Sequence, residues 1–380
     1  MGKAIIVDAV RTPLGKRGGV LGSVHPVELL ARVLSALVNR CGVPRGQVED
    51  IIAGCVTQTG EQGANIARLS ALLAGFPVHV PAVSINRMCG SSQQAIHFAA
   101  QAIEAGDMDL VIAGGVESMS RVPLGSDYGE FHPALIDKYG LVHQGISGEM
   151  MAKQWSITRD EMDRFSLESH RKAGVGTEMG FFREEIVPVK VSGEGGGEIA
   201  IDQDEGIRLD TSLEKLSSLK PAFKEDGVIT AGNSSQITDG AAAVLISSEK
   251  KAKELGLQGK ARVLHKVVVG SDPVLMLDGV IPATRKILKK SGLSLNDFDL
   301  IEINEAFASV VLAWAKELEP DMDRVNPMGG AIALGHPVGA SGARIMATMI
   351  HGLERLKGSL ALQTMCIGHG MATATIIERV

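Results

Sequence analysis

The chain has 380 residues, of which 45% are hydrophobic, 22% are charged and 3% are aromatic, and 45 are glycines. This composition is typical of a globular protein with two or three domains, and the net charge of −6 argues against a general nucleic-acid-binding role. No apolar run is long enough to span a bilayer, and the four cysteines do not form a disulfide framework, so we expect a protein of the reducing cytoplasm without a membrane partner.

The first elements follow one another closely. Residues 1–8 have the pattern of a strand, with no apolar segment of the signal-peptide kind. Residues 27–54 predict an amphipathic helix, a turn at Gly42 and a buried strand. Residues 93–105 then predict a second helix, and residues 109–115 predict a second buried strand.

The same unit recurs with a constant offset of 250 residues. Residues 282–304 repeat the helix, turn and strand of residues 27–54, and residues 359–365 align with residues 109–115. A helix predicted over residues 340–353 precedes that last strand. Such a repeat indicates a duplicated fold.

Each unit alternates apolar strands with amphipathic helices, which predicts a mostly parallel sheet covered by helices. We therefore expect an α/β protein with five layers, αβαβα, built from two duplicated βαβαβαββ units. Reactive loops would lie at the carboxyl ends of the strands.

The middle of the chain interrupts this pattern and predicts an inserted subdomain. Thr158 and Glu161 form a capping box at the start of a helix that runs to about Ala173. Residues 185–191 and 198–201 predict a hairpin around a glycine-rich turn. We expect three parts: an N-terminal unit of residues 1–118 with 236–258, an inserted loop subdomain of residues 119–235 that covers the substrate, and a C-terminal unit of residues 259–380.

Four reactive side chains stand in separate segments. Cys89 and His336 each precede a predicted helix, whereas Asn304 and Cys366 each follow a predicted strand. Two thiols, an imidazole and a carboxamide are the groups that acyl transfer through a thioester requires. A helix N-terminus lowers the pKa of a thiol, so we expect Cys89 to be the nucleophile. A lone cysteine in an apolar helix is more often simply buried, but the companion segments favour the catalytic interpretation.

Cys366 and His369 form a C-x-x-H pair. No second pair of ligands is near it in the sequence, so we expect no metal site.

The motifs, taken in order, resemble those of the thiolase family, the acetyl-CoA C-acyltransferases, over essentially the whole length. The segments that carry the resemblance are residues 6–13, 86–92, 113–120, 231–242, 304–307, 326–337 and 366–368. The resemblance implies that Cys89 attacks a 3-ketoacyl-CoA and that Cys366 protonates the departing acetyl-CoA enolate. It also implies two oxyanion holes, one from the N–H groups of Cys89 and Gly368 and one from His336 with Asn304 acting through a water.

Coenzyme A and its thioesters are the implied substrates, with no permanently bound cofactor. The resemblance places a group of residues along CoA: Arg208, Ala222 and Phe223 near the nucleotide, Ala231, Ser235 and Met276 along the pantetheine, and His143 and Phe307 in the same site. Arginine pairs well with phosphate and Phe223 offers a face to adenine, although Arg208 alone is equally well a solvated surface charge. A homodimer or a homotetramer is implied as well.

Several residues depart from the family pattern. Ser92, His369 and Ala372 stand where glycines are common, and Gln144 follows His143 where short-chain biosynthetic members carry Met. The last difference resembles degradative members and predicts substrates longer than acetoacetyl-CoA. Residues 122–142 form a shorter segment than the one that joins dimers into tetramers in many relatives.

Four other functions were weighed against this interpretation. A biosynthetic acetoacetyl-CoA thiolase is the first alternative. A decarboxylating ketosynthase would lack the second cysteine, and a non-catalytic acyl-CoA-binding protein would have lost a reactive residue. A dehydrogenase would carry a G-x-G-x-x-G after a strand, and this chain has none.

Overall fold

The computed structural model describes residues 3–193 and 196–380. Met1 and Gly2 of the first expected strand, and Glu194 and Gly195 of the expected hairpin turn, lie outside the described residues.

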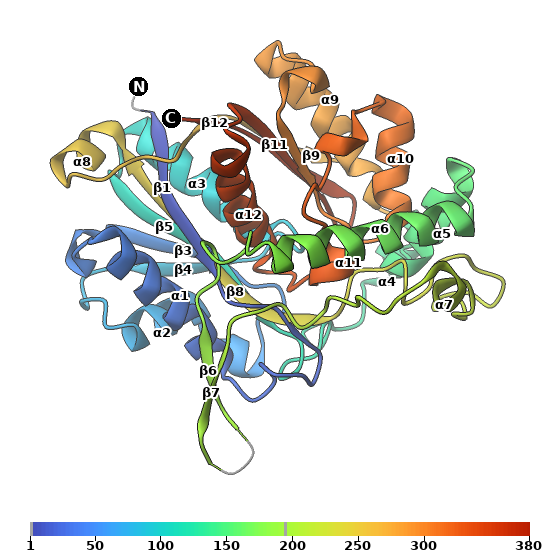
Figure 1. Cartoon of the computed structure of the whole chain (residues 1–380), viewed down its shortest axis with the longest axis horizontal. Helices are drawn as coiled ribbons and strands as arrows, with labels where there is room; N and C mark the ends of the chain where they lie inside the picture. The colour runs from blue at the N-terminus through green and yellow to red at the C-terminus, as the bar shows by residue number, and fades with distance from the viewer. Residues whose placement is uncertain (1–2, 194–195) are drawn as a thin grey trace.

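Two halves of the same architecture share one continuous sheet (Figure 1). The strand order is β1-β8-β5-β3-β4 in the N-terminal half and β10-β11-β12-β9 in the C-terminal half. The halves join where Ile5 and Ile6 of β1 pair with Arg262 and Ala261 of β9. The strands are β1 (Ala4–Arg11), β2 (Gly15–Lys16), β3 (Asp50–Gly54), β4 (Ala82–Ile85), β5 (Leu110–Ser118), β8 (Thr238–Ser248), β9 (Ala261–Gly270), β10 (Leu300–Ile303), β11 (Leu360–Ile367) and β12 (Met371–Arg379).

Helices form three layers around the two halves of the sheet. Two helices cover the outer face of the N-terminal half, two pack against each other between the halves, and two cover the outer face of the C-terminal half. In that order they are α1 (Pro26–Cys41) and α2 (Ile66–Leu73), α3 (Ser91–Ala105) and α12 (Ser341–Leu356), and α9 (Val280–Ser291) and α10 (Ala308–Leu318). The expected five-layered αβαβα fold is therefore confirmed.

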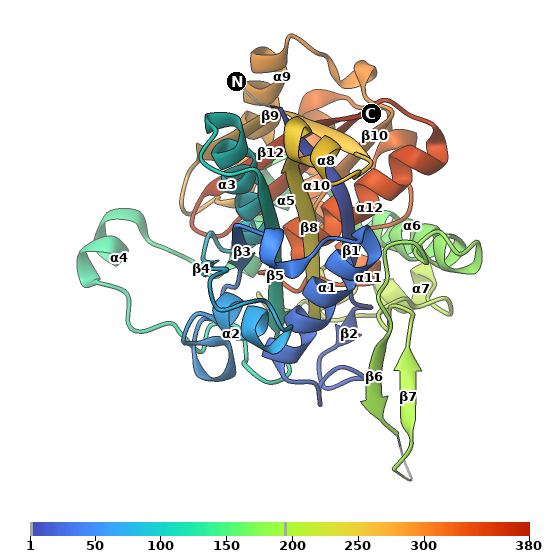
Figure 2. The same ribbon diagram turned by 90° about the vertical axis from the view of Figure 1, so that its left-hand side faces the viewer.

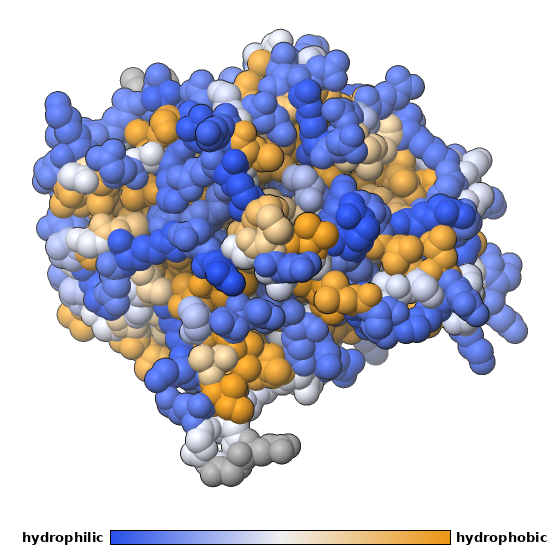
Figure 3. Space-filling view, viewed as in Figure 1, coloured by the Kyte–Doolittle hydropathy of each residue, from blue (hydrophilic) through white to orange (hydrophobic). Residues whose placement is uncertain are grey.

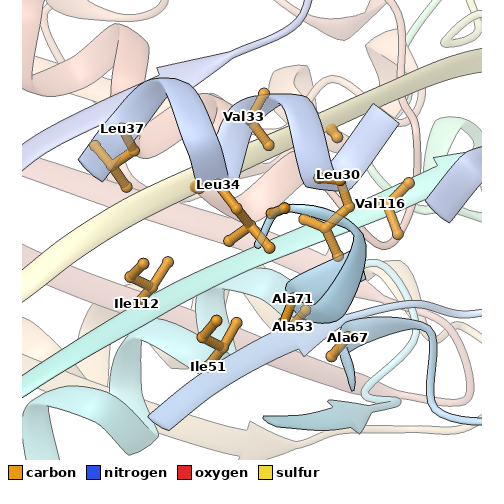
Figure 4. Close-up of a cluster of buried hydrophobic side chains, with 14 of the residues drawn as sticks. Leu30, Val33, Leu34, Leu37, Ile51, Ala53, Ala67, Ala71, Ile112 and Val116 are labelled. Atoms are coloured by element: carbon orange, nitrogen blue, oxygen red, sulfur yellow. The ribbon is translucent and has the colours of Figure 1, made fainter. Parts of the chain in front are cut away.

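The outer core of the N-terminal half shows how the sequence pattern produces a layer. Leu30, Leu34 and Leu37 recur at helical spacing on one face of α1, and all three are fully buried. Figure 4 shows them facing Ile51 of β3 and Ile112 of β5. Burying one such leucine contributes about 1.5–3 kcal/mol, so this face fixes α1 on the sheet.

The prediction of a mostly parallel sheet is wrong. Among the described residues, only β3 with β4, β3 with β5, and β10 with β11 run parallel, and the other pairs of the large sheet are antiparallel. The reason lies in β5 and β8, which are buried along their whole length because helices cover both faces. A strand buried on both faces is uniformly apolar whichever way its neighbour runs, so its sequence does not reveal its direction.

The duplication is present in the structure. β3 begins at residue 50 and β10 at residue 300, β5 begins at residue 110 and β11 at residue 360, and α3 and α12 begin at Ser91 and Ser341. The 250-residue offset therefore places the two central helices in equivalent positions, and the reactive loops that precede them meet at one end of the sheet.

The inserted segment contains α4 (Pro133–Tyr139), α5 (Gln144–Gln154), α6 (Arg159–Glu178), β6 (Val189–Ser192), β7 (Glu198–Ile201) and α7 (Leu213–Ser217). The capping box of Thr158 and Glu161 at the start of α6 is confirmed, and the helix continues to Glu178 rather than ending near Ala173. The antiparallel β6–β7 hairpin is also confirmed.

Figure 2 shows α4 standing away from the body of the molecule. The β6–β7 hairpin extends from the body at a different place. Two short helices complete the fold: α8 (Glu249–Glu254) after β8, and α11 (Ala331–Leu334) before His336. Polar residues cover most of the face seen in Figure 3, with small apolar patches between them.

Candidate active site

Cys89 lies in a tight turn, residues 86–91, that leads into α3; we call it the nucleophile turn. Met88 has a positive φ of 46°, which is unusual for a residue with a side chain. Side chains on both sides hold this conformation: Asn86 Oδ1 accepts from the Met88 N–H at 2.8 Å, and Ser91 Oγ donates to the Met88 carbonyl at 2.6 Å. Gly90 packs closely here, because a Cβ there would lie 2.3 Å from Ile367 Cδ1 and would displace that side chain.

The Cys89 thiol is buried and receives two main-chain donors. Burial raises its pKa to about 11, while hydrogen bonds from the N–H groups of Gly368 and of Cys89 itself act in the opposite direction. The lowered pKa that we expected from the helix N-terminus is therefore wrong for this state, because desolvation of the sulfur outweighs the donors. The Gly368 and Cys89 N–H groups both act on the Cys89 sulfur, so main-chain donors surround the thiol.

His336 lies in the loop between α11 and α12, residues 335–340, which we call the histidine loop. Its side chain is 5% exposed, and burial together with the Arg344 charge lowers its pKa to about 3. Its Nε2 is 3.4 Å from Asn304 Nδ2, and its Nδ1 is 2.6 Å from Ser341 Oγ. The imidazole is therefore neutral at physiological pH.

Ser341 Oγ also lies 2.9 Å from the Pro337 carbonyl. When the hydroxyl donates to that carbonyl, His336 Nδ1 carries the proton and Nε2 is a free base. When the hydroxyl turns to Nδ1, Nε2–H becomes a donor. A rotation of one hydroxyl thus lets His336 act as a base or as an oxyanion donor.

Cys366 lies within β11 and is fully buried. Burial, and next to it the negative charge that Cys89 carries as a thiolate, raise the pKa of Cys366 well above its ordinary value. Because the charge of Cys89 raises the pKa of Cys366, the two sulfurs lie near each other. His369 has a positive φ of 63°, and its ring contacts Tyr128 and Phe131 of the inserted segment, at centroid distances of 6.4 and 5.9 Å.

The residues expected along CoA fall into two groups. His143 and Phe223 stack with ring centroids 5.2 Å apart, and Phe223 meets Phe307 edge to face at 5.9 Å. Met276 belongs to the same buried cluster as Phe307, and the Ser235 N–H donates to the carbonyl next to Phe307 at 2.9 Å. These residues are brought together.

The other group lies at the surface. Ala222 and Ala231 are exposed, as is Arg208, whose N–H donates to His170 Nδ1 at 3.1 Å.

Two residues to which the sequence assigned no role, Glu305 and Ser341, hold the site residues in place. Glu305 accepts hydrogen bonds from Ser169, Asn326 and the Ile332 N–H, so it ties the Asn304 strand end to α6 and α11. Ser341 was missed because only the fold places it against His336. The sequence could have indicated Ser341 through the repeat, because Ser341 begins α12 as Ser91 begins α3.

Comparisons with known proteins agree with this geometry. Residues 4–250 match the thiolase N-terminal domain and residues 257–379 match the thiolase C-terminal domain. A steroid 3-ketoacyl-CoA thiolase of Mycobacterium tuberculosis is 47% identical, with 100% of this chain and 95% of that protein covered. A 3-ketoacyl-CoA thiolase of Cronobacter sakazakii is 46% identical over the full length of both.

The crystal structure of the Bacillus anthracis acetyl-CoA acetyltransferase superposes with a TM-score of 0.93 at 41% identity, covering 100% of this chain and 99% of that one. The chain belongs to the thiolase family, and it is an acyltransferase that acts on CoA thioesters. Within the described residues, no helix is both long and apolar enough to cross a membrane.

Proposed function

We propose that this thiolase works in the degradative direction, with Cys89 as the nucleophile that cleaves a 3-ketoacyl-CoA. The observation that carries the assignment of Cys89 is its place directly before α3, where the Gly368 and Cys89 N–H groups act on the sulfur and a second buried thiol is close enough to be affected by its charge. These donors would stabilise the oxyanion that forms when the sulfur attacks the 3-keto carbon.

The first half-reaction forms the Cys89–acyl bond and breaks the C2–C3 bond. His336, neutral at rest, accepts the thiol proton as the sulfur attacks. The electron pair of the C2–C3 bond moves to C2 as an acetyl-CoA enolate, which takes a proton from Cys366. His336 and Asn304 would hold the enolate oxygen.

The second half-reaction returns the enzyme to its resting state. A new CoA thiol gives its proton to the Cys366 thiolate and attacks the Cys89 thioester. The bond between the acyl carbon and the Cys89 sulfur then breaks, the shortened acyl-CoA leaves, and His336 returns its proton to the Cys89 thiolate. The ring stack of His143, Phe223 and Phe307 supports a role in holding CoA, together with Ala222, Ala231, Ser235 and Met276; Arg208 is proposed as the phosphate partner.

The proposed substrate is a 3-ketoacyl-CoA longer than acetoacetyl-CoA. Cys89 belongs to a buried apolar cluster whose other members are Val56, Met88, Met119, Val338, Ile345, Met365 and Ile367. Gln144 Nε2 approaches Gly368, lying 2.8 Å from the position that a Cβ there would take. The names of the two 3-ketoacyl-CoA thiolase relatives support this direction and a role in acyl-chain β-oxidation, while the structural neighbour's name favours acetyl transfer as the alternative.

A homodimer is proposed for the assembly. β4 is the end strand of the sheet, and Val83 at its middle is exposed. Leu72 and Leu73 of α2 and Phe98 of α3 are exposed as well. An open edge flanked by large apolar side chains is the kind of surface that a second copy covers.

The division into an N-terminal unit, a covering insert over residues 119–235 and a C-terminal unit remains part of the proposal. So does a reducing, cytoplasmic location, supported by four cysteines that are all free.

The test is a thiolysis assay combined with trapping of the acyl-enzyme. Mixed with an acyl-CoA and denatured, the protein should gain one acyl group on Cys89, located by peptide mapping. It should also release acetyl-CoA from a medium-chain 3-ketoacyl-CoA in the presence of CoA. An adduct only on Cys41 or Cys55, or no adduct at all, would exclude Cys89 as the nucleophile.

A further inference from the structure

Glu117 is a buried carboxylate at the end of β5, and it contacts both halves of the molecule. Its Oε2 accepts hydrogen bonds from the Val56 and Gly339 N–H groups, both at 2.9 Å. Its Oε1 accepts from the Thr57 N–H at 3.1 Å and from Gln62 Nε2 at 2.7 Å. All four partners are donors, so the hydrogen bonds are those of a carboxylate anion.

Three of these donors belong to two loops from different halves of the duplicated fold. Val56 and Thr57 follow β3 in the N-terminal half, whereas Gly339 belongs to the histidine loop of the C-terminal half. The carboxylate therefore joins the histidine loop to the sheet that carries the nucleophile turn.

The contact leaves no free space. A Cβ on Gly339 would lie 2.6 Å from the Val116 carbonyl oxygen and 2.7 Å from Glu117 Oε2. A Cβ on Gly115 would lie 2.2 Å from the Gly339 carbonyl oxygen. The histidine loop thus packs directly against the end of β5, beside the Glu117 carboxylate.

Two further hydrogen bonds hold the loop at its second residue, His336. The His336 N–H donates to Thr238 Oγ1 at 2.6 Å and to the Gln236 carbonyl at 3.2 Å. Glu117 holds the far side of the loop, next to the start of α12, where Ser341 contacts the imidazole.

The charge of Glu117 is unfavourable to the nucleophile itself. It contributes to the raised pKa of the Cys89 thiol, after burial. Its effect on the thiol therefore does not account for a role in catalysis, whereas its hydrogen bonds to Val56, Thr57 and Gly339 connect the histidine loop to the N-terminal half.

We propose that Glu117 is a positioning residue for the thiolase reaction: its carboxylate fixes the histidine loop against the N-terminal half and so sets the place of His336 relative to Cys89. The kcat measurement below rests on the proposed function, whereas the measurement of the His336 resonance does not.

Glu117→Gln keeps the shape but presents an NH2 group to one pair of N–H donors. It should lower kcat for thiolysis by about 10- to 100-fold, the cost of a small misplacement of a catalytic group. KM for CoA should stay within about twofold, because the CoA-binding residues are elsewhere. In protein carrying 13C-labelled histidine, the His336 ring resonance, assigned by its loss in His336→Asn, should shift.

The matched control is Glu49→Gln. The Glu49 carboxylate also accepts a main-chain N–H, from Leu110 at 3.0 Å, but at the opposite end of the same strand. It should leave kcat and the His336 resonance unchanged.

An unchanged His336 resonance in Glu117→Gln, or a kcat within about twofold of the wild type, overturns the proposal. If Glu117→Gln does not fold, Glu117→Asp, which keeps the charge but is one methylene shorter, is measured instead. A wild-type kcat together with an unchanged His336 resonance in Glu117→Asp would also overturn the proposal. A wild-type protein without thiolysis activity would refute the proposed function, while the resonance comparison, which needs no substrate, still decides the role of Glu117.

Discussion

The two thiols of the site differ in their surroundings, and this difference supports the separate roles proposed for them. Main-chain N–H groups of Gly368 and Cys89 point at the Cys89 sulfur, whereas burial and the nearby Cys89 charge together raise the pKa of Cys366. A thiol that holds its proton until a stronger base appears is a suitable donor to an enolate carbon.

The first prediction concerns Cys366→Ala. This variant should still transfer an acyl group from acyl-CoA to Cys89, because the nucleophile and its donors are intact. It should lose deuterium exchange at C2 of acetyl-CoA, because no group remains to move that proton. Exchange is followed by mass spectrometry of acetyl-CoA in D2O, with Cys41→Ala as the control; wild-type exchange in Cys366→Ala would assign the proton to another base.

The second prediction concerns Gln144, the residue that approaches Gly368. Gln144→Met should shift the preference toward acetoacetyl-CoA, because an apolar and slightly bulkier side chain of the same length fills acyl space. Each methylene that loses burial costs about 0.8 kcal/mol, so two methylenes should change the ratio of kcat/KM values by about 15-fold. Gln154→Met, at the exposed end of the same helix, is the control. If the ratio changes equally in both variants or in neither, Gln144 does not set chain length.

At the scale of elements, the proposed homodimer depends on the edge strand β4. An exposed edge with unpaired N–H and C=O groups invites pairing unless a charge blocks it, and β4 carries the exposed Val83 instead.

The third prediction is that Val83→Lys gives monomers. Two lysines brought together at a two-fold edge would repel each other and expose the apolar flank. Light scattering during size-exclusion chromatography should report a dimer for the wild type and a monomer for the variant. Ile199→Lys, an exposed apolar position on β7, should stay dimeric. A wild type that is already monomeric, or a Val83→Lys dimer, would exclude this edge.

Elements also show where periodicity is informative. The α6 cap at Thr158, the β6–β7 hairpin and the paired starts of α3 and α12 were all readable, since each depends on a local pattern. The direction of β8 was not readable, because a strand covered on both faces has no alternation to interpret.

At the scale of the whole molecule, buried histidines link stability to pH. His97, between the two halves, contacts Thr375 Oγ1 at 2.7 Å, and burial followed by the Lys266 charge lowers its pKa to about 3. Between pH 6.5 and 3 the unfolded chain binds a proton at His97 and the folded protein does not. The stability contribution is therefore complete above pH 6.5 and is lost as the pH falls toward 3.

The fourth prediction follows from this loss of stability at low pH. Glu302, whose pKa burial raises to about 8, changes stability with pH in the opposite direction. The prediction therefore concerns the difference in unfolding free energy between the wild type and a His97 variant. Below pH 6.5 the advantage of the wild type over His97→Gln in unfolding free energy should shrink by about 1.4 kcal/mol per pH unit. Urea unfolding at pH 7.5, 6 and 5 measures it, with the exposed His79→Gln as the control. A constant difference across that range would contradict the buried, neutral state of His97.

The sequence by itself determined the duplicated α/β fold, its family and the reactive groups, because helical and strand periodicity and motif order are written along the chain. Only the tertiary structure decided the protonation of those groups and what holds them. The pKa of Cys89 rises because folding removes water from its sulfur, although the sequence pointed to a lowered value. Glu117 and Gly339 meet across 222 residues, and Ser341 reaches His336 only when α12 is in place. Burial and hydrogen bonds between distant segments arise when layers pack, and no local pattern records them.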